Sequence, residues 1–160
     1  MENITITSTF TVYPSADALP ADVNALMQQA VGARNNAYAP YSKFHVGAAL
    51  LLENGKVVIG SNQENAAYPS GLCAERVAIF QAGALYPGVK ILKMAITAAS
   101  KQKPVESPIP PCGACRQSIG EYELKQQTPI EIWFMGETGK VYLSESLKNL
   151  LPMVFGSEYL

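Results

Sequence analysis

The chain has 160 residues, a formal net charge of -1 and a hydrophobic fraction of 48%. This length suits one domain with a single core, and the apolar content excludes intrinsic disorder. The balanced charge provides no excess of basic residues of the kind that binds nucleic acid. No stretch approaches the roughly 20 apolar residues that a membrane span needs. We therefore expect a cytosolic, unanchored protein that binds neither membranes nor nucleic acid.

The first part of the chain divides into a lead-in and the start of a domain. Residues 1–20 predict an extended lead-in with an edge strand over residues 4–12, and residues 21–160 predict a single domain. From residue 21 onward, apolar side chains recur at helical spacing, which predicts a helix that ends before Pro40. The turn at Asn54-Gly55 then joins two predicted antiparallel strands, over residues 44–52 and 56–61.

The second part continues this alternation of helices and strands. Periodicity predicts helices over residues 73–85, 113–125 and 144–150, the last one capped by Ser144, and strands over residues 92–98, 130–135 and 140–143. The polar, proline-rich residues 101–111 predict a loop. Such alternation is typical of a three-layer α/β/α sandwich, here with a mixed sheet of about five strands and helices on both faces.

The three cysteines are the most informative residues. Cys112 and Cys115 are three positions apart at the start of a predicted helix, so both sulfurs can reach one ion. Cys73 begins another predicted helix, and helix N-termini in α/β folds gather at one edge of the sheet. An odd number of cysteines in a cytosolic chain favours metal or catalytic thiols over disulfides. We expect all three thiols to meet.

Three thiols with no evident fourth ligand indicate a catalytic zinc site, because structural zinc is almost always held by four protein groups. Glu75 follows Cys73 closely and is well placed as general base and then acid beside a water on the metal. Two helix N-termini, together with Arg76 and Arg116, can offset the excess negative charge of three thiolates. His45, the sole histidine, lies in a predicted strand and is placed outside the metal site.

Cysteine spacing alone leaves other interpretations open. A Cys-x-x-Cys pair also suits a redox dithiol, and a buried cysteine such as Cys73 is often only a small hydrophobic residue. A structural zinc module completed by His45 is a further possibility. The combined pattern is more specific, because Cys73-x-Glu75 followed by Pro111-Cys112-x-x-Cys115 is the three-cysteine form of the zinc deaminase signature.

From about residue 38 to the C-terminus, the chain resembles the cytidine deaminase family, in its small homotetrameric branch. The segments that carry the resemblance are YSKFHVGAAL (residues 41–50), NQENAAYP (62–69), CAER (73–76) and PCGACRQ (111–117), with similar residues at 150–152 and 155–156. The resemblance implies a cytidine deaminase fold in which Cys73, Cys112 and Cys115 bind Zn²⁺. It also implies that Glu75 is the proton shuttle and that Arg76 hydrogen-bonds the thiolates.

The resemblance further implies a set of substrate contacts. In this family the pyrimidine is held by a backbone amide and by aromatic rings, the ribose by polar side chains, and part of the site by a neighbouring subunit. The corresponding residues are Ala74 (amide), Phe44 and Phe155 (rings over the pyrimidine), Asn62 and Glu64 (ribose hydroxyl) and Tyr68 (sugar), with Phe155 and Tyr68 reaching a neighbour's ligand.

The activity implied is hydrolytic deamination at C4 of cytidine and deoxycytidine, which gives uridine and deoxyuridine for pyrimidine salvage. The nearest alternative is deamination of a cytosine-containing nucleoside antibiotic, and the segment 62–69 favours simple nucleosides. A homotetramer with shared sites is also implied. The apolar stretch 150–155 independently predicts self-association, because a small monomer would have difficulty covering it.

Overall fold

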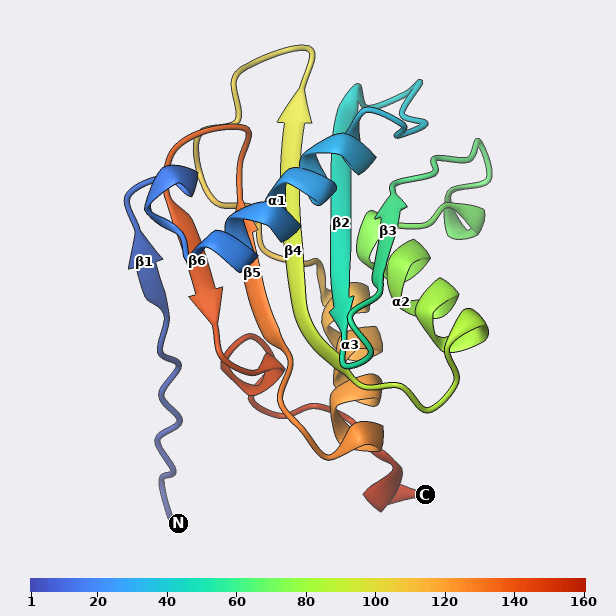
Figure 1. The fold of residues 1–160 in the computed structure, drawn as a ribbon. Helices are drawn as coiled ribbons and strands as arrows, with labels where there is room; N and C mark the ends of the chain where they lie inside the picture. The colour runs from blue at the N-terminus through green and yellow to red at the C-terminus, as the bar shows by residue number, and fades with distance from the viewer.

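A computed structural model describes residues 1–160 as a mixed six-stranded sheet with helices on both faces (Figure 1). The strands are β1 (Thr11–Tyr13), β2 (Phe44–Leu52), β3 (Val57–Ser61), β4 (Ile91–Ser100), β5 (Glu131–Met135) and β6 (Val141–Ser144). Their order in the sheet is β1-β6-β5-β4-β2-β3, and only β4 and β5 pair in parallel.

The helices form the outer layers of the expected sandwich. Helix α1 (Ala21–Arg34) covers one face of the sheet, and α2 (Ala74–Leu85) and α3 (Gly113–Gln126) cover the other (Figure 1). The sheet has a hydrophobic core on each face, because successive side chains of a strand point to opposite faces. In β4, Ala95 packs with α1, while Met94 and Ile96 pack with α2 and α3. None of the helices is long and apolar enough to cross a membrane. The predicted α/β/α architecture is confirmed.

The sheet has one strand more than the expected five, and the bounds predicted for the N-terminal strand are wrong. β1 covers only Thr11–Tyr13, because the short strand β6 offers it three partners, Leu143, Tyr142 and Val141. Residues 1–9 are exposed. Aromatic contacts secure the paired end of the lead-in, where Tyr13 lies 5.4 Å from Trp133 between ring centroids.

The helix predicted over residues 144–150 is also wrong. Only a 3-10 turn forms there, over Leu147–Asn149, and Ser146 caps it by accepting a hydrogen bond from the Lys148 amide. Ser144 is the last residue of β6, and its hydroxyl donates to the Ser146 carbonyl. The buried Glu123 carboxylate of α3 accepts hydrogen bonds from the amides of Ile130 and Leu147, which ties the start of this turn to α3.

Gly60 of β3 positions the start of α2. A Cβ atom at residue 60 would lie 2.4 Å from the Ala74 carbonyl oxygen and 2.6 Å from the Ala78 amide nitrogen. Real Cβ atoms do not approach backbone atoms this closely, so only glycine allows α2 to pack against β3 at this depth. Because Ala74 directly follows Cys73, this contact also fixes the position of Cys73 at the start of α2.

Substitution of Gly60 tests this contact. We expect Gly60→Ala to destabilise the protein by about 1–3 kcal/mol, because the backbone of α2 must move away from β3. Gly32→Ala is the matched control, since a Cβ atom there meets nothing within 4 Å and alanine favours the helix by up to about 1 kcal/mol. Thermal unfolding at equal protein and zinc concentrations measures both changes. An unchanged unfolding midpoint for Gly60→Ala would show that a Cβ atom fits at residue 60 without moving α2.

Candidate active site

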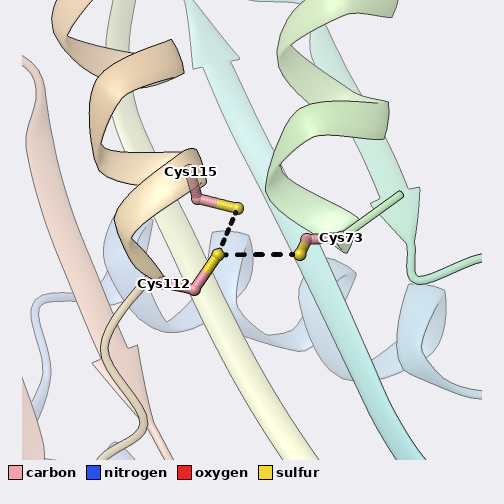
Figure 2. Close-up of side chains that lie close together, drawn as sticks. All are labelled: Cys73, Cys112 and Cys115. Carbon is pink, nitrogen blue, oxygen red and sulfur yellow. Dashed lines mark hydrogen bonds between the residues drawn. The ribbon is translucent and has the colours of Figure 1, made fainter. Parts of the chain in front are cut away.

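The first turns of α2 and α3 bring the three cysteines together. Cys73 is the N-cap residue of α2, Cys112 is the N-cap residue of α3, and Cys115 lies in the first turn of α3. Figure 2 shows the sulfur atoms pointing toward one another, with Cys112 Sγ 3.8 Å from Cys73 Sγ and 3.5 Å from Cys115 Sγ. All three sulfurs lie within 4.8 Å of one another and can hold a metal ion. The expected convergence of the thiols is confirmed, and His45 is not part of the group.

The surroundings of Cys73 favour its thiolate form. Hydrogen bonding with the Cys115 thiol, and next with Arg76, lowers the pKa of Cys73 to about 5 against the opposing effect of burial. The same Cys73 contact and burial raise the pKa of Cys115. Arg76 Nη2 lies 3.9 Å from Cys73 Sγ, as expected for a residue that supports the thiolates. The N-termini of two helices add their positive ends at the same point, which favours the thiolate form that binds metals.

A pocket of about 820 Å³ lies beside the thiols. This volume is within the usual range for small-molecule sites. Its lining brings together most of the site residues expected from the sequence, and these are Phe44, Asn62, Glu64, Tyr68, Cys73, Glu75, Arg76 and Cys112. A small molecule in this pocket can therefore approach the sulfur cluster directly.

Asn62 and Glu64 line the pocket and also build its wall. The Asn62 side-chain oxygen accepts a hydrogen bond from the Val46 amide at 2.8 Å, and its amide donates to the Phe44 carbonyl at 2.9 Å. Glu64 accepts hydrogen bonds from the Tyr41 amide at 2.9 Å and from the Ser42 hydroxyl. Burial raises the pKa of Glu64, but these hydrogen bonds outweigh it and leave the pKa below its usual value. Both side chains are therefore held rigidly at the pocket.

Glu75 and Ala74 occupy the first turn of α2, next to Cys73. The Glu75 side chain lines the pocket although only 5% of the residue is exposed. Burial raises the pKa of its carboxyl group. Ala74 is fully buried, and its amide belongs to the N-terminal turn of the helix. The Glu75 carboxyl group and the Cys73 thiol thus face the same pocket from one helix terminus.

Three expected site residues do not line the pocket: Ala74, Cys115 and Phe155. Ala74 and Cys115 are buried in the first turns of α2 and α3, whereas Phe155 lies on the surface. It is 56% exposed and stacks on Tyr159 with ring centroids 5.6 Å apart. The backbone of the chain holds it near α3, where the Gln117 side chain donates to its carbonyl. Phe155 therefore forms no part of the pocket within the single chain.

Ile109 and Pro110 form part of the pocket wall, as expected for the proline-rich loop that leads into Pro111-Cys112. Other pocket contacts have no signal in the sequence. Ser42 holds Glu64, and no local pattern indicates that contact, because the two residues are 22 positions apart. Their roles become visible only in the folded chain.

Comparisons with known proteins agree with this geometry. A family model described as "Cytidine and deoxycytidylate deaminase zinc-binding region" matches residues 20–128. A cytidine deaminase of Halalkalibacterium halodurans is 40% identical over 139 residues, which cover 86% of this chain and 96% of that protein. A cytidine deaminase of Sporosarcina psychrophila is 48% identical over 101 residues, which cover 63% of this chain and 70% of that protein.

Solved structures show the same relationship. The crystal structure of a cytidine deaminase from Burkholderia pseudomallei superposes with a TM-score of 0.70 at 42% identity, covering 82% of this chain and 97% of that one. The crystal structure of a cytidine deaminase from Mycobacterium tuberculosis gives 0.65 at 31% identity, covering 86% and 99%. Because the matched region spans both helix termini that carry the thiols, the chain belongs to the cytidine and deoxycytidylate deaminase family.

Proposed function

We propose that this enzyme is a zinc-dependent hydrolase that converts free cytidine and deoxycytidine into uridine and deoxyuridine for pyrimidine salvage. The observation that carries the proposal is the meeting of three thiols and the Glu75 carboxyl group at one pocket. The similar proteins are named cytidine deaminases, which supports cytidine as substrate. Hydrolysis at C4 adds one water and releases one ammonia.

The sulfur cluster fits a catalytic zinc ion. Three cysteine sulfurs within 4.8 Å are a common donor set for zinc, and structural zinc would need a fourth protein ligand. Arg76 supports the fit, because its guanidinium contacts Cys73 and its buried Nε has no hydrogen-bond partner within the chain. When bound by Cys73, Cys112 and Cys115, zinc would supply Lewis-acid activation of a water molecule.

The residues of this chain would then bind the substrate and move protons. Glu75 takes one proton from the attacking water and delivers it to N3 of the pyrimidine. It then moves the second proton of that water to the amino group at C4, which leaves as ammonia. The amide of Ala74 holds the pyrimidine ring beside Glu75. Phe44 covers the ring, while Asn62 and Glu64 bind a ribose hydroxyl.

The charge of the pocket supports an unphosphorylated substrate. Its lining contains two carboxyl groups, on Glu64 and Glu75, and a single cationic side chain, Arg76. That guanidinium is directed to Cys73, so it does not serve a phosphate group. A free nucleoside therefore suits the pocket better than a nucleotide or a polynucleotide.

An ultraviolet assay of cytidine loss, combined with zinc analysis of the purified protein, tests the proposal. We expect one zinc per chain and zinc-dependent formation of uridine. Bound zinc without turnover would indicate a structural zinc module, and thiol oxidation without zinc would indicate a redox dithiol. Faster turnover of a cytosine-containing nucleoside antibiotic than of cytidine would favour the alternative substrate class.

The surface also supports a homotetramer with shared active sites. Helix α2 exposes Phe80 (45%) and Leu85 (60%), and no charged residue follows Arg76 in this helix. Phe155 is also an exposed large apolar residue, and a second copy of the chain would bury such side chains. We place the assembling domain at residues 21–160, with residues 1–20 as a lead-in.

Truncation after Pro152 tests the shared site. We expect weakened assembly and a KM for cytidine raised by about 2- to 10-fold, the usual worth of one aromatic contact, with zinc still bound. Light scattering, steady-state kinetics and zinc analysis measure the three quantities. A fully active monomer, or a truncated chain that keeps its assembly and its KM, would contradict the shared site.

A further inference from the structure

Helix α3 contacts the C-terminal segment, residues 147–156, at several points along its length. Gln117 Nε2 donates to the Phe155 carbonyl at 2.7 Å. One turn later, Gly120 makes room for Val154, because a Cβ atom at residue 120 would lie 2.6 Å from Val154 Cγ2. Leu124 lies a further turn along and approaches Gly156. Gln117, Gly120 and Leu124 are three and four positions apart, so they share one face of the helix.

The same helix turn connects this segment to the metal-binding loop. Arg116 Nε donates to the Pro111 carbonyl, and its Nη1 donates to the Leu150 carbonyl, both at 2.8 Å. Arg116 and Gln117 directly follow Cys115. The beginning of α3 therefore carries two of the three thiols and also anchors the C-terminal segment at two carbonyl groups.

Phe155 is held in an unusual way for an exposed residue near a chain end. The residue is 56% exposed and its ring stacks on Tyr159, while its backbone carbonyl accepts a hydrogen bond from Gln117. Residues this close to a terminus are poorly ordered unless something ties them down. The hydrogen bond ties down the backbone and leaves the ring directed outward.

We propose that Gln117 is a positioning residue that holds Phe155, with Tyr159 stacked on it, ready to enter the pocket of a neighbouring subunit. This inference rests on the proposed function, in which Phe155 covers the neighbour's pyrimidine. The benefit is preorganisation, since a tail that is already ordered does not lose that freedom when substrate binds. The Phe155 contact is present before and during the reaction, so its loss raises KM and leaves kcat nearly unchanged.

Two substitutions remove the hydrogen bond while keeping the size of the side chain. Gln117→Leu removes the donor, and Gln117→Glu keeps the shape but places a carboxylate against the Phe155 carbonyl. We expect both to raise the KM for cytidine by about 2- to 10-fold, the worth of one hydrogen bond, with kcat, zinc content and oligomer mass unchanged. Glu121→Gln is the matched control, because Glu121 is exposed one turn later on α3, and its KM should equal that of the wild type.

A double-mutant cycle with Phe155→Ala decides whether Gln117 acts through the ring. We expect Phe155→Ala to raise KM and Gln117→Leu to add nothing in that background. An unchanged KM for Phe155→Ala would overturn the shared site and the role of Gln117 with it. If Phe155→Ala raises KM, the shared site stands, and two results would still contradict the positioning role of Gln117. The first is that Gln117→Leu leaves KM unchanged. The second is that Gln117→Leu raises KM equally whether residue 155 is phenylalanine or alanine. Loss of zinc or of the oligomer in the Gln117 variants would also overturn it, by showing a general structural role.

Discussion

A Glu75→Gln enzyme is expected to fold and bind zinc normally, yet to turn over cytidine about 10²- to 10⁴-fold more slowly, the usual contribution of a positioned general acid and base. Glutamine has nearly the same size and lies in the same buried position, but it cannot accept and release the proton that hydrolysis requires. The loss is expected in kcat, because the proton transfers occur after the nucleoside has bound.

Steady-state kinetics together with zinc analysis and thermal unfolding separate this chemical effect from misfolding. Glu64→Gln is the informative comparison, since Glu64 lines the same pocket but is hydrogen-bonded to Tyr41 and Ser42. Its substitution should act mainly on KM. Near-normal kcat in Glu75→Gln would remove this carboxyl group from the mechanism.

The metal cluster could be predicted because it depends on short spacings and on a general property of the fold. Cys112 and Cys115 meet through the geometry of a single helix turn, which the sequence spacing specifies directly. Cys73 joins them because α2 and α3 cover the same face of the sheet and begin at adjacent points (Figures 1 and 2). The starts predicted for both helices agree with the structure to within one residue.

Features that depend on contacts between distant parts of the chain could not be predicted from the sequence. β1 is only three residues long, and β6, far along the chain, decides how much of the lead-in can pair. The segment after β6 forms only a 3-10 turn, and it is held through its Leu147 amide by buried Glu123, which lies 24 positions away. The anchoring of Phe155 is likewise invisible, because Gln117 binds a backbone carbonyl, and every residue type offers that acceptor.

Asn62 and Glu64 each combine a structural role in the pocket wall with a proposed role in substrate binding. Each side chain closes a hydrogen bond to the backbone of residues 41–46 and also faces the pocket. The resemblance to known deaminases predicted their place at the pocket, but not their support of the wall. We therefore expect substitution of Asn62 to combine loss of the proposed ribose contact with movement of Phe44, whose carbonyl Asn62 binds.

Removal of one thiol is expected to abolish both metal binding and activity. Cys112→Ala leaves two sulfurs, and we expect its zinc affinity to fall by more than about 100-fold, because even residues that only support metal ligands cost about 10- to 100-fold when removed. Turnover of cytidine should fall in parallel with zinc content. Zinc should also raise the thermal midpoint of the wild type and leave that of the variant unchanged, since only the folded wild-type chain offers the full site.

His45→Ala is the control that separates a three-sulfur site from a four-ligand structural site. His45 lies in β2, where it pairs with Ala99 of β4, and it is not among the residues whose ligand atoms converge. We therefore expect His45→Ala to keep one zinc per chain after dialysis against a competing chelator, whereas Cys112→Ala loses it. Equal loss of zinc in both variants would mean that the histidine completes the coordination. The site would then have no position for a reacting water, and hydrolysis at this cluster would be excluded.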